Sequence, residues 1–187
     1  MTIHDLILSI ENAKQENNYM LARSIALEAL KDHTDDYRLY EELADIYLFE
    51  GNLEKADEVL AIARELHPES GTGMYLDGYI ATAKGEFDRA IETLSKANID
   101  MPNNAEILRN LGWAYVMTLD KEEHASNLSK GISLLRRAHI LAPDEPMIIN
   151  DLSVALIAAG KEDEAKEILA KLGQPNLVDI IKSTPLL

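Results

Sequence analysis

The chain has 187 residues, 47% of them hydrophobic and 27% charged, which is enough apolar material for one domain over residues 1–187. It contains no cysteine, which excludes disulfides and thiolate zinc sites. The net charge of −15 disfavours nucleic acid and anionic lipid as partners, because both are polyanionic. Neither a secretory signal nor the roughly 20 apolar residues of a membrane span stands out, so we expect no membrane insertion and a cytoplasmic location.

A 34-residue period organises the chain. Pro68 and Pro102 stand 34 residues apart, and the residues before each proline match at the same offsets. Thus Gly51, Leu53, Ala56, Leu60 and Ala63 recur as Gly85, Phe87, Ala90, Leu94 and Ala97. A period of this length is typical of stacked helical hairpins.

Extending the period in both directions predicts five helical hairpins, over residues 3–34, 37–70, 71–104, 105–145 and 146–176. No run alternates like a strand, so the predicted class is all-α. Glycine or asparagine separates the two helices of most hairpins, where the backbone must turn. Small residues stand where we expect paired helices to approach closely, at Ala22, Ala56, Ala90, Gly131 and Ala165.

The fourth hairpin breaks the period. Pro102 and Pro143 stand 41 residues apart, which is seven more than the regular interval and equals two helical turns. Apolar residues from Ala125 to Ala138 keep helical spacing, so we predict a second helix lengthened at its N-terminus and starting near Asp120. An ordered loop over residues 122–129 is the alternative.

The two ends of the array differ. Residues 176–183 place Leu177, Ile180 and Ile181 on one helical face, which predicts a capping helix over the last hairpin. At the other end, the predicted core of the first hairpin does not use the apolar residues Ile3, Ile7 and Leu8. Exposed clusters of this kind mark contacts, so we predict self-association through the first helix, with a homodimer as the simplest form.

Two segments carry a family resemblance: Leu108-x-x-Leu111-Gly112-x-x-Tyr115, and Ala56-x-x-x-Leu60-x-x-Ala63 followed by Pro68. They resemble the tetratricopeptide repeat, and the same spacing extends along nearly the whole chain. The resemblance implies a right-handed superhelix of about five hairpins plus the capping helix, with the first helix of each hairpin lining a concave groove. It names no partner, because a fold of this kind serves many.

On that implied groove, the side chains left over from the core stripe are Arg38, Glu41, Asp45, Phe49, Tyr75, Tyr79, Arg109, Asn110, Trp113, Met117, Asn150 and Val154. The aromatic members predict an apolar lane, because rigid rings give a large contact area to a bound peptide at low entropic cost. The alternative is that Trp113 and Tyr79 pack between neighbouring helices as core.

These patterns favour a non-enzymatic module that binds a peptide or helix of another protein in the aromatic groove. The five histidines stand on different hairpins without metal-ligand spacing, and no nucleophile is identifiable, so we expect no catalytic residue, metal or cofactor. Two alternatives stay open: a bacterial secretion-type chaperone covering an apolar client segment, and a self-assembling structural subunit. The partner itself cannot be read from the sequence.

Overall fold

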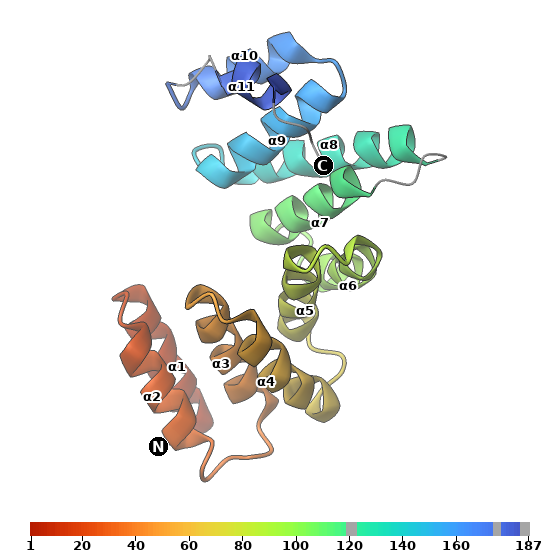
Figure 1. Ribbon diagram of the computed structural model, residues 1–187. Coiled ribbons are helices and arrows are strands. Elements are labelled where there is room, and N and C mark those ends of the chain that lie inside the picture. Colours follow the sequence, from red (N-terminus) through yellow and green to blue (C-terminus); the bar gives the residue numbers. More distant parts are fainter. Residues whose placement is uncertain (119–122, 174–176, 184–187) are drawn as a thin grey trace. The chain divides into compact units, whose positions relative to one another are not determined.

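The computed structural model describes residues 1–118, 123–173 and 177–183, which form eleven helices and no strand (Figure 1). The helices are α1 (Ile3–Gln15), α2 (Tyr19–Ala29), α3 (Tyr37–Phe49), α4 (Leu53–Leu66), α5 (Gly71–Ala83), α6 (Phe87–Asp100), α7 (Ala105–Met117), α8 (His124–Leu141), α9 (Pro146–Ala158), α10 (Glu162–Ala170) and α11 (Leu177–Ser183). Each of the five predicted ranges holds one helix pair, and the all-α prediction is confirmed. None of the described helices is long and apolar enough to cross a membrane.

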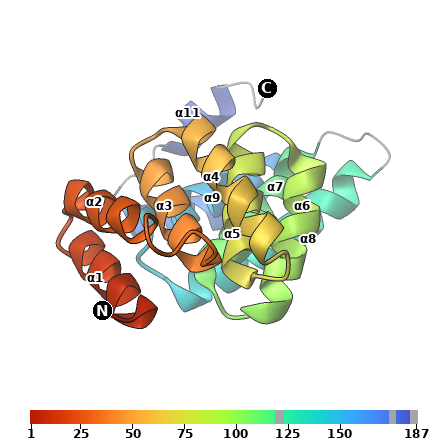
Figure 2. The ribbon, with the colours of Figure 1, turned by 90° about the horizontal axis from the view of Figure 1, so that it is seen from below.

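The helices divide into two compact units, Met1–Ile80 and Ala81–Leu187, with the boundary inside α5. A single domain over the whole chain stays a prediction. Within the units, helices that follow one another in sequence pack together: α1 on α2, α3 on α4, α7 on α8, and α9 on α10. The pairing of α1 with α2 can be followed in Figure 2.

The first unit is held together by alanines and branched aliphatic residues. Ile10 of α1 and Leu39 of α3 are fully buried, together with Ala22 and Ala26 of α2. Because an alanine adds little bulk, the helix that carries it can approach its partner closely. The turn between α1 and α2 takes a left-handed backbone at Asn17, with φ of 57°, which asparagine tolerates better than most residues.

In the second unit, α7 and α8 approach each other closely. A Cβ atom added to Gly131 would lie 2.7 Å from the carbonyl oxygen of Gly112 and 2.7 Å from Cγ2 of Val116. A Cβ added to Gly112 would lie 2.9 Å from Cγ of Leu135. Both helices therefore need glycine where they cross, as the small-residue pattern at Gly131 predicted.

The insertion extends α8. This helix has 18 residues, against 14 in α4 and α6, and its early residues Asn127 and Leu128 are buried. Residues 124–129 of the alternative loop are helical. The predicted start at Asp120 lies outside the described residues, and the described helix begins at His124 after Glu123.

The last helix covers the end of the second unit. Leu177 and Ile181 of α11 are partly buried against the core that α8, α9 and α10 share, as the capping prediction required. The most buried residue is Val178, which the sequence analysis did not place on that face. The side chain of Ile180 lies outside the described residues.

Substituting Gly131→Ala tests the α7–α8 contact. Alanine gains up to about 1 kcal/mol of helix propensity over glycine, but forcing a methyl group into a filled space costs about 1–3 kcal/mol. We expect a net loss in the free energy of unfolding, measured by urea denaturation and circular dichroism. The control Ser129→Ala changes an exposed residue of the same helix and should be neutral or slightly stabilising. A Gly131→Ala protein at least as stable as wild type would contradict the contact.

Candidate functional site

The twelve predicted groove residues lie on four helices, six residues in each unit. In the first unit α3 carries Arg38, Glu41, Asp45 and Phe49, and α5 carries Tyr75 and Tyr79. In the second unit α7 carries Arg109, Asn110, Trp113 and Met117, and α9 carries Asn150 and Val154.

The acidic stretch of α3 is neutralised in part by a lysine from α1. Nζ of Lys14 lies 2.8 Å from Oε2 of Glu42 and 2.7 Å from Oδ2 of Asp45. Burial lowers the pKa of Lys14, but the two carboxylates more than offset this and leave it raised. Burial likewise raises the pKa of Glu42, against the effect of Lys14. Asp45 is therefore held in an ion pair that joins the first hairpin to the second.

Glu41 is buried, with only 6% of its surface exposed, beside the start of α5. Its Oε1 atom lies 2.8 Å from the point where a Cβ on Gly73 would stand. A side chain at position 73 would therefore require this carboxyl group to shift. Burial raises the pKa of Glu41, although hydrogen bonding from Ser70 and Gly73 lowers it in part. Glu41 thus offers little surface to a partner.

The exposed aromatic group of the first unit is Phe49, at the end of α3. Of the surface of Phe49, 62% is exposed. Its ring stacks on the ring of Tyr19 in α2, with the ring centroids 3.4 Å apart and the ring planes 7° from parallel. Tyr75 and Tyr79 of α5 are partly buried, and Tyr75 packs against the core of α3 and α4. Arg38 is exposed and pairs with Asp36 at 2.6 Å.

In the second unit, Trp113 stands at the edge of the core. It is partly buried and packs against the apolar cluster formed by α7, α8, α9 and α10. The core alternative is therefore true of part of this side chain, and the rest of it stays accessible. Met117, one turn further along α7, is also only partly buried.

A charged pair lies beside Trp113 and joins α7 to α9. Nε of Arg109 donates a hydrogen bond to Oδ2 of Asp151 at 2.6 Å. Burial raises the pKa of Asp151, and the Arg109 guanidinium lowers it in part. Asn110 and Val154 are buried, so they leave little surface for a ligand, whereas Asn150 is exposed. Arg109 therefore links α7 to α9, and its role in a groove stays a prediction.

Three contributors to these faces were absent from the sequence prediction: Lys14, Tyr19 and the pairing role of Asp151. Lys14 and Asp45 are 31 residues apart, close to one repeat, so a lysine facing two acids one repeat later was a signal for the pair. Nothing in the sequence singles out Tyr19 as the partner of Phe49. Over the described residues, no group of three His, Cys, Asp or Glu side chains could hold a metal ion.

Comparison with known proteins agrees with this arrangement. Residues 42–100 match the family model described as tetratricopeptide repeat. No curated protein matches the chain. Similar solved structures include residues 41 to the end of MamA from Desulfovibrio magneticus RS-1, with 16% identity, a TM-score of 0.66 and coverage of 96% of both chains.

Two further structures share the fold. PilF of Pseudomonas aeruginosa is 16% identical, with a TM-score of 0.70, over 92% of this chain and 75% of that one. A thermophilic tetratricopeptide-repeat protein of Thermus thermophilus is 21% identical, with a TM-score of 0.68, over 90% of this chain and 88% of that one.

The paired helices and these likenesses place the chain in the class of helical-hairpin repeat proteins. Residues 42–100 match the tetratricopeptide repeat, as the sequence motifs predicted, and the chain shares its fold with the similar solved structures.

Replacing Glu41 by glutamine should change stability with pH. In the folded chain Glu41 keeps its proton to a higher pH than its ordinary pKa of 4.5. From about this pH upward, until Glu41 also loses its proton in the folded chain, the folded state therefore binds more protons than the unfolded state. The free energy of unfolding contributed by this group falls as pH rises through the window. Glu41→Gln removes the buried charge, so it should be more stable than wild type at neutral pH and less sensitive to pH.

The control is Glu58→Gln, an exposed position on α4, which should leave both the stability and its pH dependence unchanged. Urea denaturation of the three proteins at several pH values measures the effect. A Glu41→Gln protein that is less stable than wild type at neutral pH would mean that the ionised carboxylate stabilises the fold.

Proposed function

We propose that this chain is a non-enzymatic protein-interaction module that binds a peptide or helix of a partner on the exposed faces of its first helices. The observation that carries the proposal is the position of Trp113. The Trp113 ring packs against the core of the second unit but is only partly buried. Arg109, which pairs with Asp151 of α9, lies one turn before Trp113 on α7. A rigid, partly exposed aromatic side chain beside polar groups is the usual anchor of a protein interface.

The family supports the coarser part of this proposal, since tetratricopeptide repeats are scaffolds that bind other proteins. The particular binding surface and the chemistry of the partner are inferred from this chain alone. Phe49 offers an exposed ring in the first unit, and residues 1–80 hold 17 acidic against 6 basic side chains. A partner segment with apolar and basic residues fits this combination best.

Partner capture from an extract of the native organism, followed by mapping of the bound peptide, tests the proposal. Trp113→Ala and the milder Met117→Ser should each weaken binding of the captured partner, Trp113→Ala by tenfold or more if it is an anchor. Ile140→Ala removes a side chain that is 77% exposed on α8, away from the predicted groove, and is the matched control. Circular dichroism checks that each variant is folded.

Two results would count against the groove. Trp113→Ala protein that unfolds much more easily, yet binds normally when folded, would show that the ring is only core. Equal weakening by Ile140→Ala would place the contact elsewhere. The mapped segment also separates the alternatives: an apolar segment kept unfolded in the complex indicates a secretion-type chaperone, and a second copy of this chain indicates a structural subunit.

We also propose self-association through α1. Leu8 is exposed, whereas Ile3 and Ile7 are partly buried against the core of the first unit. Leu8→Lys should therefore remove the contact with little loss of stability, while a change at Ile7 would disturb the core as well. Sedimentation should show wild type associating at high concentration and Leu8→Lys remaining monomeric. The control Ile99→Lys changes an exposed residue of α6 and should associate like wild type. A monomeric wild type would end this proposal.

A further inference from the structure

A groove of about 540 Å³ runs along α8 in the second unit, beside the turn that joins α9 to α10. Helix α8 packs against α7 and α9, and this α8 groove follows a face that both helices leave exposed. On α8 it extends from Ala125 to Ile140, and Ala159 and Lys161 of the turn form its other wall. None of the twelve residues predicted for the concave groove lines it, so the two surfaces are separate.

The insertion in the fourth hairpin lengthens the α8 groove. Helix α8 has 18 residues against 14 in α6, and Ala125 lies in its added N-terminal part. The residues of α8 that line the groove recur at steps of three and four, over about four helical turns. A surface of this length and spacing suits another helix lying alongside it.

The floor of the α8 groove is apolar. Leu128 and Ile132 line it and belong to the core of the second unit. Ile140 continues the same stripe at the end of the groove and is 77% exposed. Ser129 and Ser133 lie between these residues and are small, so a ligand can approach the stripe without displacing a bulky side chain.

The charge of α8 is opposite to the charge of the chain. Among the helices that the structure describes, α8 alone has no aspartate or glutamate, although 33 of the 187 residues are acidic. Three cations line the α8 groove, and no described carboxylate does: Arg136 and Arg137 of α8, and Lys161 across from them. The groove is thus a positive, partly apolar strip on an acidic protein.

The acidic residues at the start of α10 leave part of this charge in place, because each pairs with a different cation. The pairs are Glu162 with Lys182, Asp163 with Lys166, and Glu164 with Arg136. Arg136 is therefore compensated. Arg137 donates to the carbonyl oxygen of Pro102 at 3.3 Å, which does not neutralise its guanidinium. Arg137 and Lys161 supply the positive charge of the groove.

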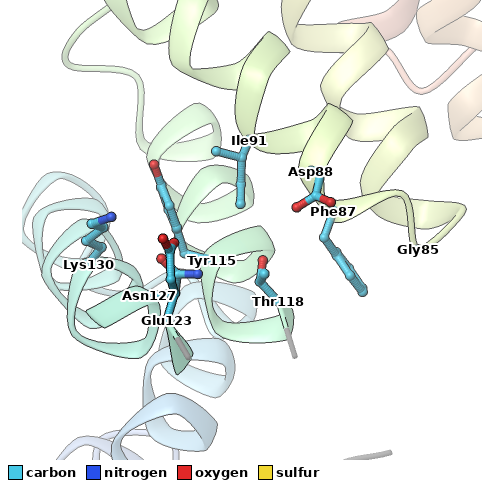
Figure 3. A pocket seen from close by; sticks show the side chains of 9 residues that line it. All are labelled: Gly85, Phe87, Asp88, Ile91, Tyr115, Thr118, Glu123, Asn127 and Lys130. Carbon is cyan, nitrogen blue, oxygen red and sulfur yellow. The ribbon is translucent and has the colours of Figure 1, made fainter. Parts of the chain in front are cut away.

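A second pocket on α8, toward α6 and α7, lacks this combination. Lys130 stands there beside Tyr115, with its ammonium 5.5 Å from the ring centroid (Figure 3). Asp88 and Glu123 line the same pocket, so charges of both signs meet in it. Of the two surfaces, the α8 groove alone joins an apolar stripe to charge of one sign.

We propose that the α8 groove binds an acidic amphipathic helix of a partner protein. The apolar face of that helix lies along the stripe from Ala125 to Ile140, and its carboxylates pair with Arg137 and Lys161. An extended peptide fits less well, because the backbone groups of α8 are already paired within the helix and offer no main-chain ladder.

The rest of the chain argues against a polyanion in this groove. The net charge of −15 repels a strand that is negative along its whole length, such as a nucleic acid. An amphipathic helix avoids this repulsion because its acids stand only where the cations are. The α7 face suits a basic and apolar segment, so the chain would hold two segments of opposite charge.

The experiment measures fluorescence anisotropy of labelled synthetic peptides with the full-length protein at low salt. The probe is a capped peptide of about 15 residues, as long as the groove, with leucine and alanine on one helical face and glutamate on both flanks. A second peptide has lysine in place of glutamate, and a third has the first composition in scrambled order. The acidic amphipathic peptide should bind about tenfold more tightly than either, and more weakly as salt rises.

Charge variants test the assignment to the groove. Arg137→Gln and Lys161→Gln should each weaken binding of the acidic peptide about threefold, because each removes one partly exposed charge pair. The control Lys130→Gln removes the same charge from an exposed residue of α8 outside the groove and should bind like wild type. Circular dichroism checks that each variant is folded.

Two further comparisons separate the groove from other surfaces. Ser133→Glu places a carboxylate in the groove and should weaken binding, whereas Ser133→Gln, of nearly the same size, should not. Ile140→Ala shortens the apolar stripe and should weaken the acidic peptide, while Met117→Ser, which alters the proposed α7 face, should leave it unchanged. Loss of binding at the α7 face would therefore not affect this test.

Several results would overturn the proposal. Equal binding of the acidic and lysine peptides would show that the sign of the charge is not recognised. Equal loss in Lys130→Gln and Lys161→Gln would reduce the effect to net charge. Single-stranded DNA that binds more tightly than the acidic peptide would assign the groove to a polyanion. Self-association that Ser133→Glu abolishes, without any peptide binding, would assign it to a second copy of this chain.

Discussion

The close approach of paired helices, seen where α7 crosses α8, is the constraint on which the remaining structure depends. Ala22, Ala56, Ala90 and Ala165 are fully buried at the equivalent position of four hairpins, and Gly131 takes that position in the remaining one. At Gly131 the backbone of α7 is so near that a methyl group would not fit unless one of the two helices moved. Because the residues at the crossing are small, the larger side chains on either side of it fill the core. The outer face of the first helix is then not needed for the pairing and can make other contacts.

Those outer faces are used in two ways. Charged groups join two pairs of neighbouring first helices: Lys14 joins α1 to Asp45 of α3, and Arg109 joins α7 to Asp151 of α9. The Arg109–Asp151 pair is largely buried, so removing either partner would leave an uncompensated charge, whereas Asp45 of the other pair is partly exposed. Aromatic groups such as Trp113 then stand beside rigid polar neighbours, which is a favourable arrangement for binding another protein.

Much of the fold could be predicted because it repeats. The 34-residue period located five hairpins, the small residues located the crossings, and phase continuity through residues 125–138 predicted the longer α8. The site was harder. Glu41 and Asn110 occupy positions that the period assigns to the groove, yet both are buried, and Glu41 lies against Gly73 of the next repeat. A period places a residue on its own hairpin, but contacts between hairpins depend on the particular side chains that meet there. For the same reason the sequence did not single out Val178.

The fluorescence of Trp113 provides the most direct test that the face of α7 binds the partner, because this is the only tryptophan of the chain. The measurement is acrylamide quenching and emission wavelength of the folded protein, with and without the mapped partner peptide, provided the peptide lacks tryptophan. We predict moderate quenching in the free protein, then weaker quenching and emission at shorter wavelength when the peptide covers the ring. A peptide that binds, as shown by calorimetry, while leaving both quantities unchanged would contradict the account.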